Sequence, residues 1–495
     1  MTGTIEACSD SATSSSNDGR AGPMRGLISR SRGALDRERT VEELAMGLLQ
    51  DVTISAVPLD RFVPVLGAER VSDARALAAR LREKLAGAAI WNVNSTAIGG
   101  GVAEMLPSLL AYARAEGIDT RWVVMQGEPE FFAVTKRLHH ALHGSVGAGG
   151  LPTEQDRAVY ERITSANAAD LGGRLGPGDV VILHDPQTAG MAPMLHARGA
   201  RVIWRCHIGH DRSGPEVESA WAFLAPYLRD VPAYVFSRRE YVPPQLDAAR
   251  AAIVQPSIDA FSPKNVELDE ATVRAILHHV GVLSGPAPPG SHPVFPRRDG
   301  SPGRVERFAD LVLSGPPPSA DTPLVVQVSR WDPLKDMCGV MQAFAELVES
   351  GRAGRAELVL AGPNVRGVAD DPEGPAVYRD VLHAWHELPP EARVRITLAT
   401  IPTNDVDENA AIINALQRHA AIVVQKSLHE GFGLTVTEAM WKARPVIATR
   451  VGGIQDQIVD GETGVLVEPG DRDAFTAALA ALLADEPRRE AMGRA

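Results

Sequence analysis

The 495-residue chain contains only three cysteines, Cys8, Cys206 and Cys338, and none of them forms a Cys-x-x-Cys pair. So sparse and odd-numbered a set supports neither a disulfide framework nor a zinc site, and it is typical of the reducing cytoplasm. We therefore expect a cytoplasmic protein. Cys206 lies next to His207 and could be a thiolate nucleophile, but a small buried residue at the end of a strand is the prediction we favour.

Long apolar runs and clusters of positive charge are also absent. The longest apolar stretch, 474–484, is too short to span a bilayer, and residues 8–22 are Ser-rich and polar, unlike a secretory signal. The formal charge is −12, and Lys and Arg do not gather along the sequence. We therefore expect no membrane span and no nucleic-acid partner, although an acidic protein can still carry a local basic pocket for phosphate.

A chain of this length is too long for one ordinary hydrophobic core, so two domains are expected. From about residue 40, short apolar runs alternate with amphipathic stretches, which is the pattern of βαβ units on a parallel sheet. The strands that we predict cover residues 88–93, 121–125, 179–183, 201–206, 233–236, 324–328, 357–360, 395–399, 421–424, 445–448 and 464–467.

These strands predict an α/β protein made of two Rossmann-like, doubly wound domains that face each other across a cleft. Residues 1–39 are assigned to a flexible extension, 40–260 to the first domain, 261–321 to a Pro/Gly-rich connection and 322–495 to the second domain. Ligands of such sheets bind beyond the carboxyl ends of the strands, so the loops that follow the strands should carry the chemistry.

The segment 429–439 (HEGFGLTVTEA) follows a predicted buried strand and opens a helix. Its two glycines allow close approach of a ligand to the backbone, and the free N–H groups at a helix start favour an anion. Glu430 on the loop and Glu438 within the helix could each accept hydrogen bonds from a vicinal diol, which both a hexose and a ribose offer. A capped helix with acidic residues is the alternative, but the Gly-Phe-Gly between the two acids is more specific.

The segment 328–336 (VSRWDPLKD) follows the first strand of the second domain and contains Arg330 and Lys335. Two permanent cations in this position suit a diphosphate whose negative charge grows as a nucleotide leaves. Taken alone they could equally be solvated surface charges. Their place after the first strand, together with the glutamate motif, favours a phosphate site.

Three loops of the first domain also follow predicted strands. They contain the glycines 99–101, the segment 184–187 (HDPQ) and the segment 205–211 (RCHIGHD). The glycines are a plausible floor for a cleft, and the polar residues should point into it. His207, His210 and Asp211 could be read as metal ligands, but no further Cys or His stands at a useful spacing, so we expect no metal and no other cofactor.

The motifs of the second half, with 451–454 (VGGI), resemble the group 1 family of retaining glycosyltransferases with the two-Rossmann-domain fold, GT-B. This resemblance implies that the first domain binds an acceptor and the second a nucleotide-sugar donor. It implies a catalytic set of Glu430, Arg330, Lys335 and His207. It also implies a donor-binding set of Gly100, Gly101, Arg330, Lys335, Asn364, Glu430, Gly431, Phe432, Gly433, Leu434, Thr435 and Glu438.

The segments 91–96 (WNVNST), 184–187, 204–207 (WRCH) and 297–303 (RRDGSPG) are similar to the trehalose synthases of the glycosyltransferring type. That similarity implies transfer of glucose from a nucleoside-diphosphate glucose to free glucose, giving α,α-trehalose. It implies an acceptor-binding set of His184, Asp185, Gln187, Arg205 and His207. Sugar nucleotide, glucose and trehalose are then the partners, and a homodimer remains open.

Three other functions fit parts of this pattern. A retaining trehalose phosphorylase would use phosphate in place of a nucleotide, and a transferase of the same fold could use another acceptor. A non-catalytic sugar-nucleotide sensor is the non-enzyme alternative. It is favoured by the end of the chain at 492–495 within a helical pattern, where relatives of this fold continue with a helix that crosses back to the first domain.

Overall fold

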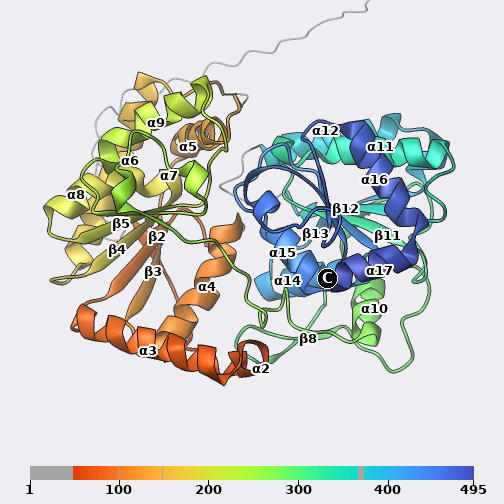
Figure 1. Cartoon of the computed structure of the whole chain (residues 1–495), viewed down its shortest axis with the longest axis horizontal. Helices are drawn as coiled ribbons and strands as arrows, with labels where there is room; N and C mark the ends of the chain where they lie inside the picture. Colours follow the sequence, from red (N-terminus) through yellow and green to blue (C-terminus); the bar gives the residue numbers. More distant parts are fainter. Residues whose placement is uncertain (1–47, 98–99, 148, 366–372) are drawn as a thin grey trace, which may run out of the picture. The chain divides into compact units, whose positions relative to one another are not determined.

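The computed structural model describes residues 48–97, 100–147, 149–365 and 373–495. The predicted extension 1–39 lies outside these ranges. The described residues contain two seven-stranded sheets and one short hairpin, with helices on both faces of each large sheet (Figure 1). The predicted fold class, two Rossmann-like doubly wound α/β domains, is confirmed.

The first sheet has the strand order β1-β3-β2-β4-β5-β6-β7. Every pair in it is parallel except the edge pair β1 and β3. Its strands are β1 (Leu49–Val52), β2 (Ile90–Asn94), β3 (Thr120–Met125), β4 (Val180–His184), β5 (Arg201–Cys206), β6 (Ala233–Phe236) and β7 (Ala251–Ile253).

Two hydrophobic cores cover the two faces of this sheet. Val123 and Met125 pack into one core, and their neighbours Trp122 and Val124 pack into the other, as the alternation of side chains along a strand requires. The helices of this domain are α2 (Val63–Leu66), α3 (Ala68–Leu85), α4 (Gly100–Ala115), α5 (Pro129–Leu142), α6 (Glu154–Arg174), α7 (Asp185–Thr188), α8 (Ala192–Ala197) and α9 (Pro215–Leu228). Residues of α4 contribute to the second core, and residues of α5, α6, α8 and α9 contribute to the first.

The second sheet has the order β10-β13-β12-β11-β14-β15-β16, and only the edge strand β10 is antiparallel. Its strands are β10 (Asp310–Val312), β11 (Leu324–Val328), β12 (Glu357–Pro363), β13 (Ile396–Ile401), β14 (Ile422–Gln425), β15 (Val446–Thr449) and β16 (Val465–Val467). All five residues of β11 are buried, which suits a central parallel strand covered on both faces.

The helices α10 (Glu270–His279), α14 (Val406–His419) and α15 (Leu434–Trp441) contribute to the core on one face of this sheet. The other face is covered by α11 (Met337–Glu349), α12 (Gly374–Glu387), α13 (Pro390–Arg393), α16 (Arg472–Ala484) and α17 (Glu486–Arg494). Helix α10, strand β10 and the hairpin of β8 (Val294–Pro296) and β9 (Pro302–Arg304) all come from residues 261–321. That segment therefore contributes to the sheet and the core of the second domain.

The predicted strands of both domains are present, with end points that differ by at most three residues. Apolar runs of four to six residues fixed their positions, because such runs must be buried on both faces of a parallel sheet. Across the described ranges, no helix combines the length and the apolar character that a bilayer crossing requires. The loops after β4, β5, β11 and β14 lie at the carboxyl ends of parallel strands, where the candidate site residues are found.

Candidate active site

The loop between β14 and α15 carries the glutamate motif. It leaves the sheet at Gln425, and α15 begins at Leu434 after Gly433, whose φ is +84°. A Cβ on Gly433 would lie 2.8 Å from Ile454 Cγ1, and one on Gly431 would lie 2.7 Å from the carbonyl oxygen of His207. Only glycine fits at these two positions, so the motif's glycines bring its backbone against neighbouring loops.

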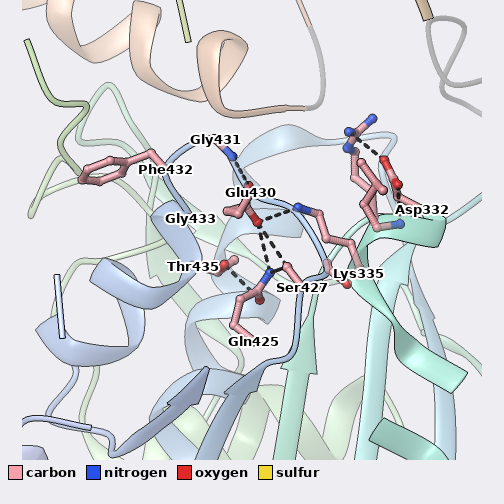
Figure 2. Close-up of polar contacts among 12 residues, drawn as sticks. Asp332, Lys335, Gln425, Ser427, Glu430, Gly431, Phe432, Gly433 and Thr435 are labelled. Carbon is pink, nitrogen blue, oxygen red and sulfur yellow. Dashed lines mark hydrogen bonds and ion pairs between the residues drawn. The ribbon is translucent and has the colours of Figure 1, made fainter. Parts of the chain in front are cut away.

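Lys335 and Glu430 form an ion pair between two loops. Lys335 ends the 3-10 turn Pro333–Lys335 after β11, and its Nζ lies 2.5 Å from Glu430 Oε2. Figure 2 shows the ammonium pointing at the carboxylate, with the Phe432 ring directed away from it. Both side chains are largely buried, with exposed fractions of 15% and 14%. The sequence analysis assigned both residues to the site, and the structure brings them together.

Three further groups donate to the Glu430 carboxylate. Gln425 Nε2 and Ser427 Oγ lie 3.4 Å and 3.3 Å from Oε2, and the Gly431 N–H lies 3.2 Å from Oε1 (Figure 2). Gln425 in turn accepts a hydrogen bond of 3.2 Å from Thr435 Oγ1 at the start of α15. The carboxylate is thus surrounded by one cation and three donors, which offsets the cost of removing it from water.

Sequence reasoning missed the polar residues that fix these loops. Gln327 is fully buried within β11 and donates to the carbonyl oxygen of Lys335 over 2.8 Å, and Gln425 and Ser427 hold Glu430. Their signal in the sequence is a glutamine inside or at the end of an otherwise apolar strand, LVVQV and IVVQ. A buried amide needs a partner, so such a glutamine indicates a strand that anchors a loop.

Asp332 connects Arg330 to the first domain. Its Oδ2 lies 3.3 Å from Arg330 Nη2 and 3.6 Å from Lys136 Nζ on α5. Burial alone would raise the pKa of Asp332, but the cations Arg330, Lys136 and Lys335 hold that pKa below its ordinary value. Arg330 is therefore held in place by a charged carboxylate, and Lys136 is a third cation of this region that the sequence analysis did not identify.

Glu438 belongs to a separate polar cluster. It lies within α15 and is 2% exposed, and its carboxylate contacts Lys264 Nζ at 3.2 Å and Gln417 Nε2 at 3.4 Å. Burial raises its pKa. The two glutamates of the motif thus have different partners: Glu430 pairs with a loop lysine, and Glu438 with a lysine of the segment that follows β7.

In the first domain, His184 and His207 form a stacked pair. Their ring centroids lie 5.4 Å apart, His184 Nδ1 lies 3.1 Å from His207 Nε2, and His184 Nε2 lies 3.1 Å from Asn92 Oδ1. Burial lowers the pKa of His184 to about 3 and that of His207 well below its ordinary value, so both are neutral at pH 7. With the amide oxygen of Asn92 as acceptor, His184 donates from Nε2, His207 donates from Nε2, and His207 Nδ1 is left as an acceptor.

Asp185 holds the backbone of the next loop. It lies at φ +61°, and its Oδ1 accepts a hydrogen bond of 2.7 Å from the His207 N–H. The indole of Trp204 donates to the carbonyl oxygen of Asp185 over 3.1 Å. The Asp185 side chain thereby connects the loop after β4 to the loop after β5. The sequence pattern did not indicate this role.

The remaining predicted residues lie at the start of α4, within α7 and at the ends of β5 and β12. Gly100, with φ +80°, and Gly101 begin α4, and a Cβ on Gly101 would lie 3.4 Å from Leu434 Cδ1. Gln187 is half-buried in α7, and Arg205 Nη2 lies 3.9 Å from Met105 Sδ. Asn364 follows β12 and donates from its backbone N–H to Ile401.

Hydrogen bonds also connect the loops of the first domain to those of the second. The hydroxyl of Tyr241, after β6, donates to the carbonyl oxygen of Gly431 over 2.6 Å. Asp211 Oδ2 accepts from the Gly452 N–H over 3.0 Å. Among the residues with described positions, no three His, Cys, Asp or Glu side chains are grouped as metal ligands.

Comparisons with known proteins match both domains of the chain. The family model "Trehalose synthase, N-terminal domain" matches residues 92–243, and "Glycosyl transferases group 1" matches residues 315–495. A trehalose synthase of Pyrococcus horikoshii is 37% identical over 409 residues, which cover 83% of this chain and 84% of that one. A trehalose phosphorylase of Pleurotus pulmonarius is 27% identical over 473 residues, covering 90% of this chain and 59% of that one.

A solved structure adds a likeness of fold. It is that of an alpha,alpha-trehalose-phosphate synthase (UDP-forming) from Burkholderia xenovorans in complex with glucose-6-phosphate. The TM-score is 0.60, the identity is 16%, and the alignment covers 82% of this chain and 94% of that one.

The first prediction concerns Asp185, whose pKa burial raises from 3.8 to about 7. The folded protein therefore keeps this proton at pH values where the unfolded chain has lost it, so the stabilisation from this group is present below about pH 4 and is lost as the pH rises through about 7. We expect the free energy of unfolding of the wild type, relative to Asp185→Asn, to fall between pH 4 and pH 7 in urea titrations. Asp119→Asn, at an exposed position, is the control. If the difference in unfolding free energy between the wild type and Asp185→Asn does not change with pH, the prediction is wrong.

Proposed function

The chain belongs to the trehalose synthase family of group 1 glycosyltransferases, and from that premise we propose that it transfers α-glucose from a nucleoside-diphosphate glucose to free glucose, forming α,α-trehalose reversibly. The observation that carries the proposal is the contact between Lys335 and Glu430, 2.5 Å apart beside the start of a helix. It places a cation, which suits a diphosphate, next to a carboxylate, which suits sugar hydroxyls.

The donor half of the proposal assigns one part of the ligand to each group. Lys335 and Arg330 neutralise the diphosphate, and the free N–H groups at the start of α15 add a partial positive charge. Glu430 accepts hydrogen bonds from hydroxyls of the hexose, and Glu438 from those of the ribose. The Asp332 contact supports this assignment because it keeps Arg330 at the edge of the sheet.

The acceptor half rests on the polar residues of the first domain. Because His207 is neutral and its Nδ1 is an acceptor, it can receive a hydrogen bond from a hydroxyl of glucose. His184, Asp185, Gln187 and Arg205 complete the acceptor set. The carbonyl oxygen of His207 lies close enough to Gly431 to exclude any larger residue there, so this loop and the donor loop are neighbours.

We infer that the reaction retains the anomeric configuration and needs no metal. The bond between the anomeric carbon and the phosphate oxygen breaks, the acceptor oxygen bonds to the same face of that carbon, and the departing phosphate takes the acceptor's proton. Glu430 already holds Lys335 and three donors, an arrangement that suits an anchoring group better than a nucleophile. The protein then contributes alignment and stabilisation of the leaving charge.

A trehalose phosphorylase is the second candidate, favoured by the 27% identity to the Pleurotus enzyme. The two reactions differ in the group that leaves or attacks, a nucleoside diphosphate in one and inorganic phosphate in the other. The buried carboxylate of Glu438 supports the nucleotide reaction, since inorganic phosphate has no ribose for it to bind.

The second prediction is the product itself. We expect incubation of the protein with glucose and ADP-, UDP- or GDP-glucose to yield α,α-trehalose with at least one donor, together with the matching nucleoside diphosphate. Trehalose and phosphate without nucleotide should give no glucose 1-phosphate. The products are identified by ¹H NMR, which also reports the anomeric configuration. Phosphate-dependent cleavage with no reaction of any sugar nucleotide would establish the phosphorylase, and binding of a sugar nucleotide without turnover would establish a sensor.

The third prediction concerns Glu430→Gln. The amide keeps the size of the side chain but loses the charge that faces Lys335 and the hexose, so kcat should fall about 10²- to 10³-fold, the scale of losing one key electrostatic group. The affinity for the nucleoside diphosphate alone should change less than about threefold, because Lys335 and Arg330 remain. Steady-state kinetics and calorimetric titration measure the two quantities. Glu462→Gln, in an exposed turn, is the matched control, and near-normal turnover of Glu430→Gln would contradict the assignment.

A further inference from the structure

Lys264 bridges two carboxylates that belong to different helices. Its Nζ lies 2.8 Å and 3.0 Å from the two carboxylate oxygens of Glu104 on α4, and 3.2 Å from Glu438 Oε1 on α15. The exposed fraction of the side chain is 16% for Lys264, 41% for Glu104 and 2% for Glu438. The ammonium therefore lies between a carboxylate that reaches solvent and one that does not.

The two helices joined in this way both begin at glycines of the candidate donor site. Helix α4 begins at Gly100 and Gly101, and α15 begins directly after Gly433. The two helix starts approach each other, since a Cβ on Gly101 would meet Leu434 at 3.4 Å. A residue that ties α4 to α15 thus acts on both glycine-bearing turns.

Lys264 and Lys442 are the two cations near Glu438, and Lys264 is the one that contacts its carboxylate. Lys442 Nζ donates to Gln417, Asn265 and the carbonyl oxygen of Glu438, but no bond from it to the Glu438 carboxylate is among its described contacts. Burial lowers the pKa of Lys442 to about 7, whereas Glu104 and Glu438 raise the pKa of Lys264 above its ordinary value despite its burial. Gln417 donates to Glu438 Oε2 and so orients the carboxylate without supplying charge.

We propose that Lys264 is a positioning residue of the donor site, which keeps the buried Glu438 carboxylate charged and oriented for the ribose diol of the donor and ties it to α4. The inference rests on the proposed function, in which that diol binds Glu438. Without Lys264 the buried carboxylate would keep only the amide of Gln417 and the nearby Lys442, whose own pKa burial lowers, so protonation of Glu438 would become more favourable. A protonated carboxyl accepts hydrogen bonds from hydroxyls far less strongly.

A ribose hydroxyl can bind Glu438 while Lys264 keeps its contacts to Glu104. Lys264 makes its two shorter contacts to Glu104, and the contact to Glu438 Oε1 is the longest of the three. The ammonium can therefore remain on Glu104 while a hydroxyl shares Oε1. A loss of Lys264 should thus appear in recognition of the ribose, and not only in stability.

The fourth prediction tests this with Lys264→Gln, which fills a similar space and can donate hydrogen bonds but carries no charge. We expect the wild type to bind its preferred nucleoside diphosphate about tenfold more tightly than the 2′-deoxy counterpart, the effect of one hydrogen bond to a charged group. In Lys264→Gln this ratio should fall to within about twofold, and Lys264→Arg, which keeps the charge, should restore most of it. Calorimetric titration with ADP, UDP, GDP and their 2′-deoxy forms measures the ratios.

The control is Arg274→Gln, which removes an ion pair of α10 with Glu270 and should leave the ratio unchanged. Thermal melting of each variant shows whether it is folded, and Lys264→Arg provides a charged variant if Lys264→Gln melts early. A Lys264→Gln protein that keeps the wild-type ratio would overturn the inference, as would a wild type that binds both nucleotides equally. If the wild type binds no nucleoside diphosphate, the proposed function is wrong. This outcome is visible in the wild type alone, so it is distinguished from a failure of the Lys264 inference.

Discussion

The ion pair between Lys335 and Glu430 is the constraint on which the candidate site depends. It joins the loops after β11 and β14, which are paired strands at the centre of the second sheet. Both side chains are largely buried, so each charge would be costly without the other. Gln425, Ser427 and the Gly431 N–H complete the shell around the carboxylate. The pair therefore holds the two loops against each other.

Under the proposed function, the charged groups of the second domain would bind the donor and the neutral groups of the first domain would bind the acceptor. The second-domain loops carry Lys335 and Arg330, and Lys136 lies beside Asp332, so under the proposed function these cations would face the diphosphate. The His184–His207 pair is kept neutral by burial, so it can bind hydroxyls without attracting a second anion. Such a division favours transfer between a nucleotide sugar and an uncharged sugar, and it matches the family to which the chain belongs.

The sequence predicted the fold, and it indicated the charged residues of the candidate site, because both leave local signals. Parallel strands buried on both faces appear as short apolar runs, and the loops after them are where ligands bind, so Glu430, Arg330 and Lys335 could be named directly. The further contacts around the candidate site could not be predicted. Lys264 and Glu104 are 160 residues apart, and Lys136 reaches Asp332 from another domain, so only the folded chain brings them together. The protonation of His184 and His207 likewise depends on burial that no local pattern reveals.

A crystal structure of the protein with an unreactive analogue of its nucleoside-diphosphate glucose donor tests the central claim most directly. The account predicts Lys335 Nζ within about 3 Å of a phosphate oxygen and the Glu430 carboxylate within about 3 Å of the hexose hydroxyls of the same ligand complex, the distances of charge-assisted hydrogen bonds. A ligand bound elsewhere, with Lys335 and Glu430 still paired only to each other, would contradict it.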